Sequence, residues 1–513
     1  MGDAPGCSSV PQKQEQLPQL LASSVDIVGD GNFPQGCSFS PDGLCVLTYT
    51  VNDNRLRLYN TPPLEQPQQH TPTRNEVGDN TIVDGCDNSE SAGSKKGEGG
   101  DQANALPDNS TLSTPLSWKM ALHAKAGDSV RSYAWYPLMH SSDPTTCAFL
   151  AASRDQPIHL YDAYTSAIRA SYRPYNGLDE MESPNVVTFS PDGTRIFAAG
   201  FRTDRTIHIF RTDRPGRDSE VLRLGKSRRS SDGQKGMISA LAFPQHRQQD
   251  GNFAGSSNPA VFAIGCYSPG SIYIYDDRMP CDDNPSGTIL RGGICVVGHG
   301  KAFSRRKRRF AAVSSGGSFA NDDSQGDIHN ADEEDIFSAA KVKWYQSRAR
   351  SGITQLTWSP TGEYILYSAS RRSDAVLAWD LRMLSGDASR PIRGLAAYSR
   401  DGDTNQSLDF CFDDYGKQMF VASVDKTVKI YDVATSKVTG VIRTGLADSV
   451  NGVSYKSTSA WGHKGGLLSV TVGTRRFDSF EGSDEDADDK SEEEREEAPA
   501  PGSLEVYKLS GVE

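Results

Sequence analysis

The sequence lacks the short patterns that mark most enzymes and metal proteins. No G-x-S-x-G, no H-E-x-x-H and no phosphate-binding glycine loop occurs in its 513 residues. Its nine cysteines are scattered, and none forms a C-x-x-C pair. Four histidines, His123, His159, His208 and His299, show no metal-ligand spacing and are interpreted as strand-surface or core residues. The sequence therefore predicts a protein that is not an enzyme and that needs no cofactor and no metal.

Long apolar runs are also missing. No stretch of about 18 apolar residues exists, which argues against a membrane partner. The N-terminus (MGDAPGCSSVPQKQEQ) has no basic-then-apolar layout of the kind found in secretory signals. These two absences predict an intracellular, soluble protein.

Negative charge is concentrated in one tract. Residues 478–500 contain twelve Asp or Glu against Lys490 and Arg495, a local charge of −10 out of a total of −12. The rest of the chain therefore carries only about −2. The tract is predicted to stay extended through self-repulsion, and Ser479, Ser483 and Ser491 within it are candidate phosphorylation sites that would add further charge.

What the sequence does contain is an internal repeat. An apolar strand ends in a turn like Ser-Pro-Asp-Gly, a second apolar strand and a polar turn follow, and a third strand ends in an aromatic residue and Asp. Third strands such as Val428-Lys-Ile-Tyr alternate apolar and polar residues, as half-buried strands do. Seven units carry the pattern, at residues 36–60, 131–162, 185–211, 238–277, 353–382, 407–433 and 451–477, the last resuming at 503–509.

Seven such units predict an all-β fold, a seven-bladed WD-repeat β-propeller with disordered insertions. A fourth strand is expected between units, for example around Trp118. Residues 1–19 are predicted to be disordered, and residues 20–513 to form one propeller whose ring is closed by residues 20–30. Low-complexity insertions are expected at 62–114 and 301–350, and the acidic insertion at 478–500.

Basic residues recur at one edge of the predicted blades. The turn between the second and third strands shares a face with the link to the next blade, and six of seven blades place a cation there. Cations neutralise phosphate, tyrosines stack on bases and amides read base edges, so this rim is predicted to bind RNA. The candidate RNA-binding residues are Arg154, Arg173, Tyr175, Asn176, Arg202, Arg205, Lys235, Arg371, Arg372, Lys426, Arg475 and Arg476.

The alternative for each arginine is a structural one. These cations could instead be solvated or pair with the turn carboxylates Asp53, Asp155, Asp204, Asp374 and Asp425. A separate basic run matches a nuclear-import patch, with a bare solvated loop as its alternative. That run comprises Arg305, Arg306, Lys307, Arg308 and Arg309.

Four stretches carry a resemblance to a known family. "FPQGCSFSPDG", "SRDQPIHLYDAYTSAIRASYRPYNGLDE", "DRPGRDSEV" and "ADSVNGVSY" resemble the telomerase Cajal body protein family. The similarity runs from about residue 33 to 477 and resumes at 503–509, and residues 153–180 and 211–221 are its most specific parts. Positions in matching motifs are Arg154, Arg169, Arg173, Tyr175, Asn176, Arg214 and Arg217.

The resemblance implies an RNA-binding trafficking factor. Members of the family bind a short loop box in H/ACA-type small Cajal body RNAs and in telomerase RNA, and direct the ribonucleoproteins to Cajal bodies. Expected partners are therefore small nuclear and Cajal body RNA, telomerase RNA, H/ACA ribonucleoprotein proteins and telomerase, with other proteins on the remaining propeller faces. The expected location is the nucleus and its Cajal bodies, with a cytoplasmic pool. The alternative function is a WD-repeat interaction scaffold, such as a substrate receptor or chromatin adaptor, without an RNA role.

Overall fold

The computed structural model describes most of the repeat region. It covers residues 18–64 (without 28 and 30), 115–224 (without 204), 236–276 (without 245, 248–252, 255–260 and 269), 294–297, 345, 352–445 (without 363 and 384–393), 448–474 (without 464) and 502–509. The chain divides into two units, Met1–Pro62 with Leu116–Glu513, and Pro63–Pro115. All described strands lie in the first unit.

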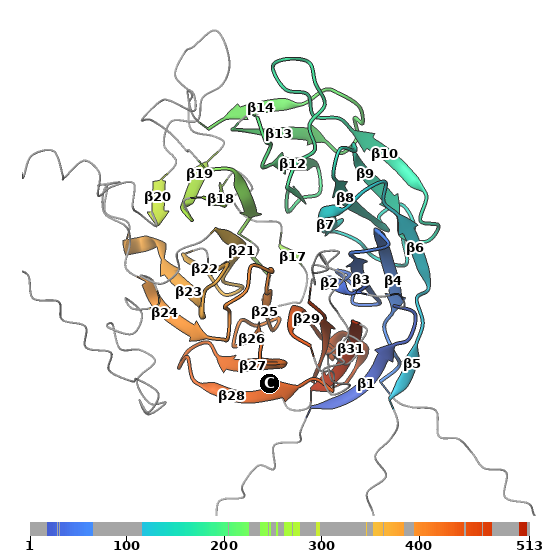
Figure 1. Cartoon of the computed structure of the whole chain (residues 1–513), viewed down its shortest axis with the longest axis vertical. Coiled ribbons are helices and arrows are strands. Elements are labelled where there is room, and N and C mark those ends of the chain that lie inside the picture. The colour runs from blue at the N-terminus through green and yellow to red at the C-terminus, as the bar shows by residue number, and fades with distance from the viewer. Residues whose placement is uncertain are drawn as a thin grey trace, which may run out of the picture. The chain divides into compact units, whose positions relative to one another are not determined.

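Seven antiparallel sheets follow one another around a ring (Figure 1). From the inner strand outward, blade 1 contains β2 (Pro34–Phe39), β3 (Cys45–Thr50), β4 (Arg55–Asn60) and β6 (Leu122–Lys125). Blade 2 contains β7 (Val130–Trp135), β8 (Ala148–Ser153), β9 (Ile158–Asp162) and β10 (Ile168–Tyr172). Blade 3 contains β11 (Val186–Phe189), β12 (Arg195–Ala199), β13 (Thr206–Arg211) and β14 (Glu220–Arg223).

Blade 4 contains β15 (Ile238–Ala242), β18 (Val261–Cys266), β19 (Ile272–Asp276) and β20 (Ile294–Val297), with the small pair β16 (His246–Arg247) and β17 (Phe253–Ala254). Blade 5 contains β21 (Ile353–Trp358), β22 (Ile365–Ser370), β23 (Ala375–Asp380) and β24 (Gly394–Ser399), and η2 (Leu381–Met383) follows β23. Blade 6 contains β25 (Phe410–Phe412), β26 (Gln418–Ala422), β27 (Thr427–Asp432) and β28 (Val438–Arg443). Blade 7 contains β29 (Val450–Ser457), β30 (Gly466–Val472), β31 (Ser503–Leu509), β1 (Gln19–Ser24) and β5 (Leu116–Trp118), with η3 (Ser459–Trp461) after β29. The all-β, seven-bladed propeller expected from the repeats is confirmed.

The aromatic residue before the Asp position of each third strand packs between blades. In every blade this ring is at most 4% exposed, which makes it the recurring core residue of the fold. The seven residues are Tyr59, Tyr161, Phe210, Tyr275, Trp379, Tyr431 and Tyr507. The neighbouring Asp instead organises the turn that follows, as Asp162 does by accepting from the backbone amides of Tyr164 and Thr165.

The first hairpin turns of blades 1 and 3 are held by a serine side chain. Ser40 Oγ donates to Asp42 Oδ1 over 2.6 Å and accepts from the Cys45 backbone amide over 3.0 Å. Gly43 completes the turn at φ +79, where a side chain would be strained. Ser190 and Arg195 repeat the same backbone contact in blade 3 at 3.0 Å.

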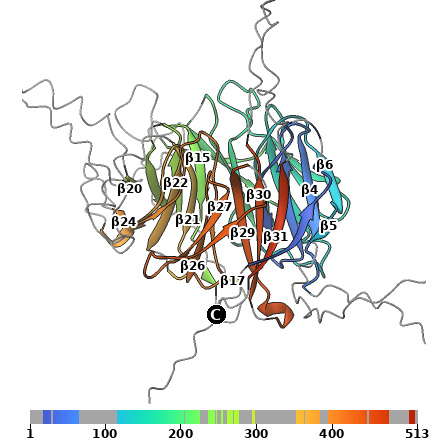
Figure 2. The ribbon, with the colours of Figure 1, turned by 60° about the horizontal axis from the view of Figure 1, so that its bottom comes forward.

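The two ends of the described chain meet in blade 7. Strand β1 pairs antiparallel with β31, with Leu20 opposite Tyr507 and Ser23 opposite Glu505, and Figures 1 and 2 show the two strands side by side. The Ser24 hydroxyl also accepts from the Leu504 backbone amide over 2.9 Å. The pairing gives the outer edge of β31 a hydrogen-bonded neighbour.

One strand expectation was wrong. Of the expected stretch 118–122, Trp118 belongs to β5, which pairs parallel with β1 in blade 7, and only Leu122 belongs to β6, the fourth strand of blade 1. Trp118 is 5% exposed: its indole Nε1 donates to the Asn60 carbonyl over 2.8 Å, and its ring lies 4.8 Å from that of Tyr59. Burial of this one large side chain therefore holds residues 116–118 against the boundary of blades 7 and 1.

Antiparallel blades send their connections alternately to two faces. We call "link face" the face that carries the turns between second and third strands together with the links between blades. Its described residues include 51–54, 154–157, 371–374, 423–426, 173–185 and 400–409. We call "hairpin face" the opposite face, with the turns between first and second strands and between third and fourth strands, including residues 40–44, 136–147, 163–167 and 413–417.

Candidate functional site

The described candidate residues lie on the link face, as their positions in the blades require. The turns after second strands supply Arg154, Arg202, Arg205, Arg371, Arg372 and Lys426. The link from blade 2 to blade 3 supplies Arg173, Tyr175 and Asn176. Their action on RNA remains a prediction at every one of these positions.

Two stretches singled out in the sequence contact one another at this face. The loop after β13, residues 212–219, extends back along blade 2: the Gly216 amide donates to the Ser171 carbonyl over 2.9 Å, and the Arg173 amide donates to the Gly216 carbonyl over 2.8 Å. The Tyr172 hydroxyl anchors the loop by donating to the Thr212 carbonyl over 2.7 Å. The loop starts on the hairpin face, and this pairing carries Arg217 to the link face.

Arg217 then joins the blade 2 link. Its guanidinium carbon lies 4.3 Å from the centre of the Tyr175 ring, within cation–π distance. Its Nη2 also forms an ion pair with Asp179, and both side chains are more than 60% exposed. The result is a solvent-facing arginine–tyrosine pair beside the exposed Arg173.

Asn176 shapes this loop. Its Oδ1 accepts from the backbone amides of Leu178 and Glu180 at 2.9 and 3.0 Å. Its Nδ2 donates to the carboxylates of Glu180 and Glu182 at 3.2 and 3.1 Å. These contacts use both amide hydrogens and two acceptor positions, so the side chain holds the link that presents Tyr175.

A second arginine–tyrosine pair lies across blades 4 and 5. The Arg371 guanidinium carbon is 5.2 Å from the centre of the Tyr267 ring, which is 43% exposed. Arg371 Nη1 also donates to the Asn405 carbonyl, and Arg372 Nε donates to Asn405 Oδ1 over 2.9 Å. The blade 5 to 6 link therefore holds both arginines in place.

That link is built on a buried arginine that the sequence analysis did not identify. Arg400 is 4% exposed, and its guanidinium donates to the carbonyls of Ser370, Ser373 and Leu408 at 3.2, 3.3 and 2.9 Å. Burial lowers the pKa of Arg400 to about 10, although Asp409 and Asp374 oppose this shift. Burial also raises the pKa of Asp409 to about 6, against the Ser407 hydrogen bond and the charge of Arg400.

Two of the turn carboxylates contact arginines, as the structural alternative for these cations predicts. Asp53 pairs with Arg57, which is 3% exposed, over 2.5 Å, and this pair braces blade 1. Asp155 lies 3.4 Å from Arg154, but both side chains are at least 60% exposed, so the contact adds little stability. Arg173, Arg202 and Lys426 are exposed and have no carboxylate within 4.0 Å among the described residues.

Charge on the link face is mixed. Exposed or half-exposed acids, including Glu180, Glu182, Asp401, Asp403 and Asp425, lie on the same face as the predicted cations. The predicted cations therefore share the link face with acids, and arginine–tyrosine pairs occur at the blade 2–3 junction and at the blade 4–5 junction.

Two carried-over arginines belong to the hairpin-face side of their blades, Arg169 near the start of β10 and Arg214 in the loop after β13. Arg169 Nε donates to Asp162 Oδ2 over 2.9 Å, and its Nη1 and Nη2 donate to the carbonyls of Thr145 and Pro144 at 2.7 and 2.6 Å. The Arg214 amide closes a turn on the Arg211 carbonyl over 3.1 Å. Arg169 is thus a brace of blade 2 rather than part of the link face.

Several predicted residues lie outside the described residues. They are Lys235, Arg475, Arg476, the import patch Arg305 to Arg309, and the serines Ser479, Ser483 and Ser491. Conversely, the sequence analysis missed Tyr267. It directly follows β18, as Arg154 follows β8 and Arg371 follows β22, so the repeat alignment would have found it.

Neither a candidate metal-binding cluster nor a membrane-spanning helix occurs among the described residues. No group of three or more His, Cys, Asp or Glu side chains among them could hold a metal ion. In the same part of the chain, no helix is long and apolar enough to cross a membrane.

Comparisons with known proteins agree with the repeat architecture and with the resemblance. The WD domain, G-beta repeat model matches residues 381–432. The chain is 28% identical to Telomerase Cajal body protein 1 of Mesocricetus auratus over 471 residues, which is 90% of this chain and 62% of that protein. The protein of the same name from Homo sapiens is 28% identical over 420 residues, 81% of this chain and 53% of that protein.

The Telomerase Cajal body protein 1 homolog of Drosophila melanogaster is 42% identical over 291 residues, 56% of this chain and 37% of that protein. The chain thus spans less than two thirds of the length of these relatives. The resemblance inferred from the four sequence stretches is confirmed over most of the chain.

Proposed function

We propose that this WD-repeat propeller, a relative of the telomerase Cajal body proteins, is a non-enzymatic binding factor that acts with telomerase and Cajal body ribonucleoproteins. It holds RNA on its link face. The observation that carries the proposal is the contact between residues 173–179 and 212–219. The two stretches most specific to the resemblance there place the exposed Arg217 over the half-buried ring of Tyr175.

The chemistry of this patch suits unpaired nucleotides. Tyr175 and the guanidinium plane of Arg217 offer flat surfaces on which a base can stack. Arg173 is exposed beside them, and Arg154 and Arg202 lie on the same face, where they can neutralise phosphates. The Arg371–Tyr267 pair repeats the arrangement at a second junction, so an RNA loop could contact the face at two points.

The finer identity of the ligand follows the resemblance. The RNA is a short loop box of an H/ACA-type small Cajal body RNA or of telomerase RNA. The protein directs such ribonucleoproteins to Cajal bodies in the nucleus, and H/ACA ribonucleoprotein proteins and telomerase are its partners. These roles would support telomerase assembly and telomere maintenance.

The second candidate is a WD-repeat scaffold without an RNA role. The mixed charge of the link face favours it, since Glu180, Glu182, Asp401 and Asp403 would repel phosphate. A protein-only scaffold should respond modestly to salt, whereas RNA affinity should fall linearly with the logarithm of salt concentration.

The deciding experiment is crosslinking in cells followed by sequencing of the bound RNA. Recovery of small structured RNAs supports the proposal, and recovery of none would overturn it. In vitro, Arg173→Glu with Arg371→Glu should weaken RNA binding roughly 100-fold in a salt-dependent manner, because two phosphate contacts become repulsive. Lys437→Glu, an exposed cation on the hairpin face, is the matched control and should leave the affinity unchanged.

A second pair of variants tests stacking. Tyr175→Ala should weaken binding roughly 5- to 150-fold, the range for one lost base–aromatic stack, while Tyr175→Phe keeps the ring and most of the affinity. Tyr415→Ala, which removes an exposed tyrosine of the hairpin face, should have no effect. Equal binding by Tyr175→Ala and wild-type protein would place the RNA elsewhere.

A further inference from the structure

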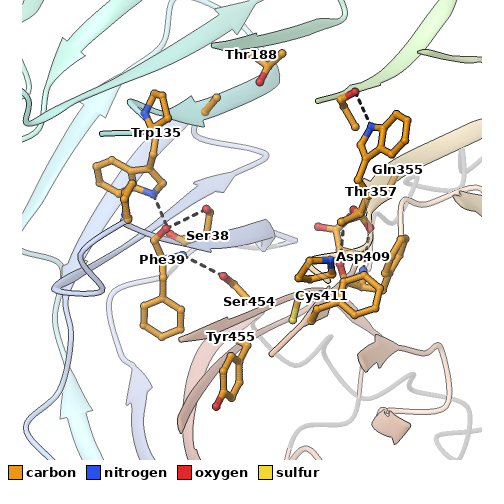
Figure 3. Close-up of a pocket in the computed structure, with 18 of the residues that line it drawn as sticks. Ser38, Phe39, Trp135, Thr188, Gln355, Thr357, Asp409, Cys411, Ser454 and Tyr455 are labelled. Atoms are coloured by element: carbon orange, nitrogen blue, oxygen red, sulfur yellow. Dashed lines mark hydrogen bonds between the residues drawn. The ribbon is translucent and has the colours of Figure 1, made fainter. Parts of the chain in front are cut away.

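A cavity of about 560 Å³ lies among the inner strands of all seven blades (Figure 3). It reaches the hairpin face, because its lining includes Pro41, Pro137, Pro191 and Pro360, which follow the ends of four inner strands. The deep end is marked by Tyr133 and Asp409. A Cβ at Gly36 would lie 3.1 Å from the Tyr133 hydroxyl and 3.2 Å from Asp409 Oδ2, so both groups converge on this glycine.

The walls of this cavity combine polar and apolar surface in about equal parts. Ser38, Thr188, Thr357 and Ser454 are half-buried and are drawn around it in Figure 3. The large rings between the blades are fixed by hydrogen bonds: Trp135 Nε1 donates to the Ser38 carbonyl over 3.1 Å, and Trp358 Nε1 to the Ala242 carbonyl over 3.0 Å. The lining therefore offers hydrogen-bond partners together with apolar surface, which suits a side chain that has an apolar stem and a polar end.

The charge of the lining is negative. Three carboxylates contribute to it, Asp409, Asp413 and Asp414, against one cation, Lys456. The Lys456 ammonium donates to the Pro41 carbonyl over 2.5 Å at the rim. The cavity therefore attracts cations and repels phosphate, the reverse of what an RNA site needs.

Asp413 has one oxygen more than the fold requires. In blades 1 and 3 the equivalent position is serine, and its single hydroxyl accepts from the backbone amide five residues later. Asp413 Oδ1 accepts from the Gln418 amide in the same way, over 2.9 Å. Its Oδ2 is buried and has no hydrogen-bond partner among the described residues, although the residue is only 2% exposed.

A buried carboxylate oxygen without a partner is costly, and serine would avoid the cost. Burial, together with the nearby charge of Asp414, raises the pKa of Asp413 against the amide hydrogen bonds of Gln418 and Lys417. A cation held in the cavity would favour the charged form of this carboxylate and offset that penalty. A positively charged ligand in the cavity would therefore explain why aspartate, and not serine, stands at this position.

We propose that this cavity receives an arginine side chain from an extended segment of a protein partner, which enters from the hairpin face. Arginine fits better than lysine because its planar guanidinium carries five donors. Those donors can serve several wall hydroxyls together, while the positive charge lies close to Asp413. The site goes beyond the proposed RNA role and lies on the opposite face, so both ligands can be held at once.

The test uses the full chain and a fluorescein-labelled peptide, Gly-Arg-Gly-Arg-Gly, in a titration followed by fluorescence anisotropy. A peptide with citrulline in place of arginine keeps the shape and removes the charge. The arginine peptide should bind at least about 10-fold more tightly than the citrulline peptide, the value of one charge-assisted contact. Asp413→Ser should remove most of that difference.

Asp413→Ser is expected to fold, since serine stands at the same position in other blades, and its Tm should stay near that of the wild type. Asp413→Asn is the second variant and keeps the Oδ1 contact to Gln418. Asp403→Asn, an exposed acid of the link face, is the control and should leave peptide binding unchanged. Equal binding of the two peptides, wild-type affinity in both Asp413 variants, or displacement of the peptide by RNA would each overturn the proposal.

Discussion

Arg169 lies near the start of the short strand β10, and Arg173 directly follows its end. The surroundings of the two side chains differ. Arg169, at the hairpin face, donates to one carboxylate and two carbonyls, and its side chain is 25% exposed. Arg173, at the link face, is exposed and is positioned through its backbone amide on Gly216. Two arginines four positions apart thus have distinct environments: one braces a turn through its side chain, and the other leaves its side chain exposed.

The difference follows from the aromatic–Asp ending of third strands. Asp162 and Asp380 end β9 and β23 on the hairpin face, and each accepts from a nearby arginine, Arg169 at 2.8 Å and Arg382 at 2.7 Å. Burial opposes ionisation of Asp162, but Arg169 and two backbone amides outweigh it and lower its pKa. In blades 2 and 5 the aspartate that ends the third strand therefore pairs with an arginine on the hairpin face. The arginines of the link face are positioned by other contacts.

The largest effect is expected where a link-face arginine is buried. Arg400→Met removes a cation with three carbonyl partners and leaves Asp409 and Asp374 without their nearest positive charge. The free energy of unfolding should fall by about 3–5 kcal/mol, measured by urea denaturation. Arg173→Met should change it by less than about 0.5 kcal/mol. If the two variants lost similar amounts of unfolding free energy, buried and exposed arginines would not differ in their contribution to stability.

Asp409 provides a pH test of the same link. Its pKa of about 6 is above its ordinary value of 3.8, so its stabilising contribution is complete below pH 3.8 and is lost as the pH rises through 6. Asp409→Asn stays neutral, so its stability relative to wild type should rise between pH 4.5 and 7.5. The gain is at most about 3 kcal/mol, reduced because the side chain keeps some solvent contact.

Thermal unfolding at several pH values would measure this gain. Asp403→Asn, in the same link but exposed, should show no such trend. A flat difference between Asp409→Asn and wild type across the range would mean that the carboxyl is not desolvated.

Substitution of Arg169 and of Arg173 by alanine should have opposite effects on stability and on RNA binding. Arg169→Ala should cost about 1–2 kcal/mol of unfolding free energy, because charge-assisted hydrogen bonds to Asp162 and two carbonyls are lost. Its RNA affinity should be unchanged. Arg173→Ala should do the opposite, with near-native stability and roughly 10-fold weaker RNA binding. Calorimetry measures the stability of each variant, and filter binding measures its RNA affinity. If both variants lost RNA affinity, the two faces would not be independent.

The smallest effect concerns Asp155. Because its contact with Arg154 is exposed, Asp155→Asn should change stability by less than about 0.5 kcal/mol, and asparagine tolerates the positive φ of +53. Release of Arg154 should raise RNA affinity about 2-fold, visible in the same binding assay at low salt. A loss of affinity would instead assign Asp155 a role in orienting Arg154.

Much of the fold was predictable because each blade repeats the same constraints. The alternation that ends in Tyr161, Trp379 or Tyr431 reports a ring buried between blades, and seven repetitions of it fix the architecture. Trp118 was misplaced because alternation shows that a segment is a strand and not which strand it pairs with. That choice depended on Asn60 and Tyr59, distant in sequence from the segment.

The candidate site was predictable by face but not by contact. Strand order alone places Arg173 and Arg371 on one face. The approach of Arg217 to Tyr175 depends on a loop that runs back along blade 2, and no periodicity encodes such a path. The unpartnered oxygen of Asp413 could not be predicted from the sequence either. It is recognised only when the hydrogen bonds of equivalent turns are compared.

Ring closure also sets an order of events in time. Ser24 of β1 and Leu504 of β31, which hydrogen-bond to each other, are 480 positions apart. At about 5–20 residues per second, a ribosome needs roughly 25–100 s to deliver the partner of β1. Throughout that interval the edge of β1 that will pair with β31 stays open to unwanted neighbours, although the other edge of β1 can already pair with β5. The nascent chain therefore has a vulnerable period whose length is set by translation speed rather than by the intrinsic folding rate of any blade.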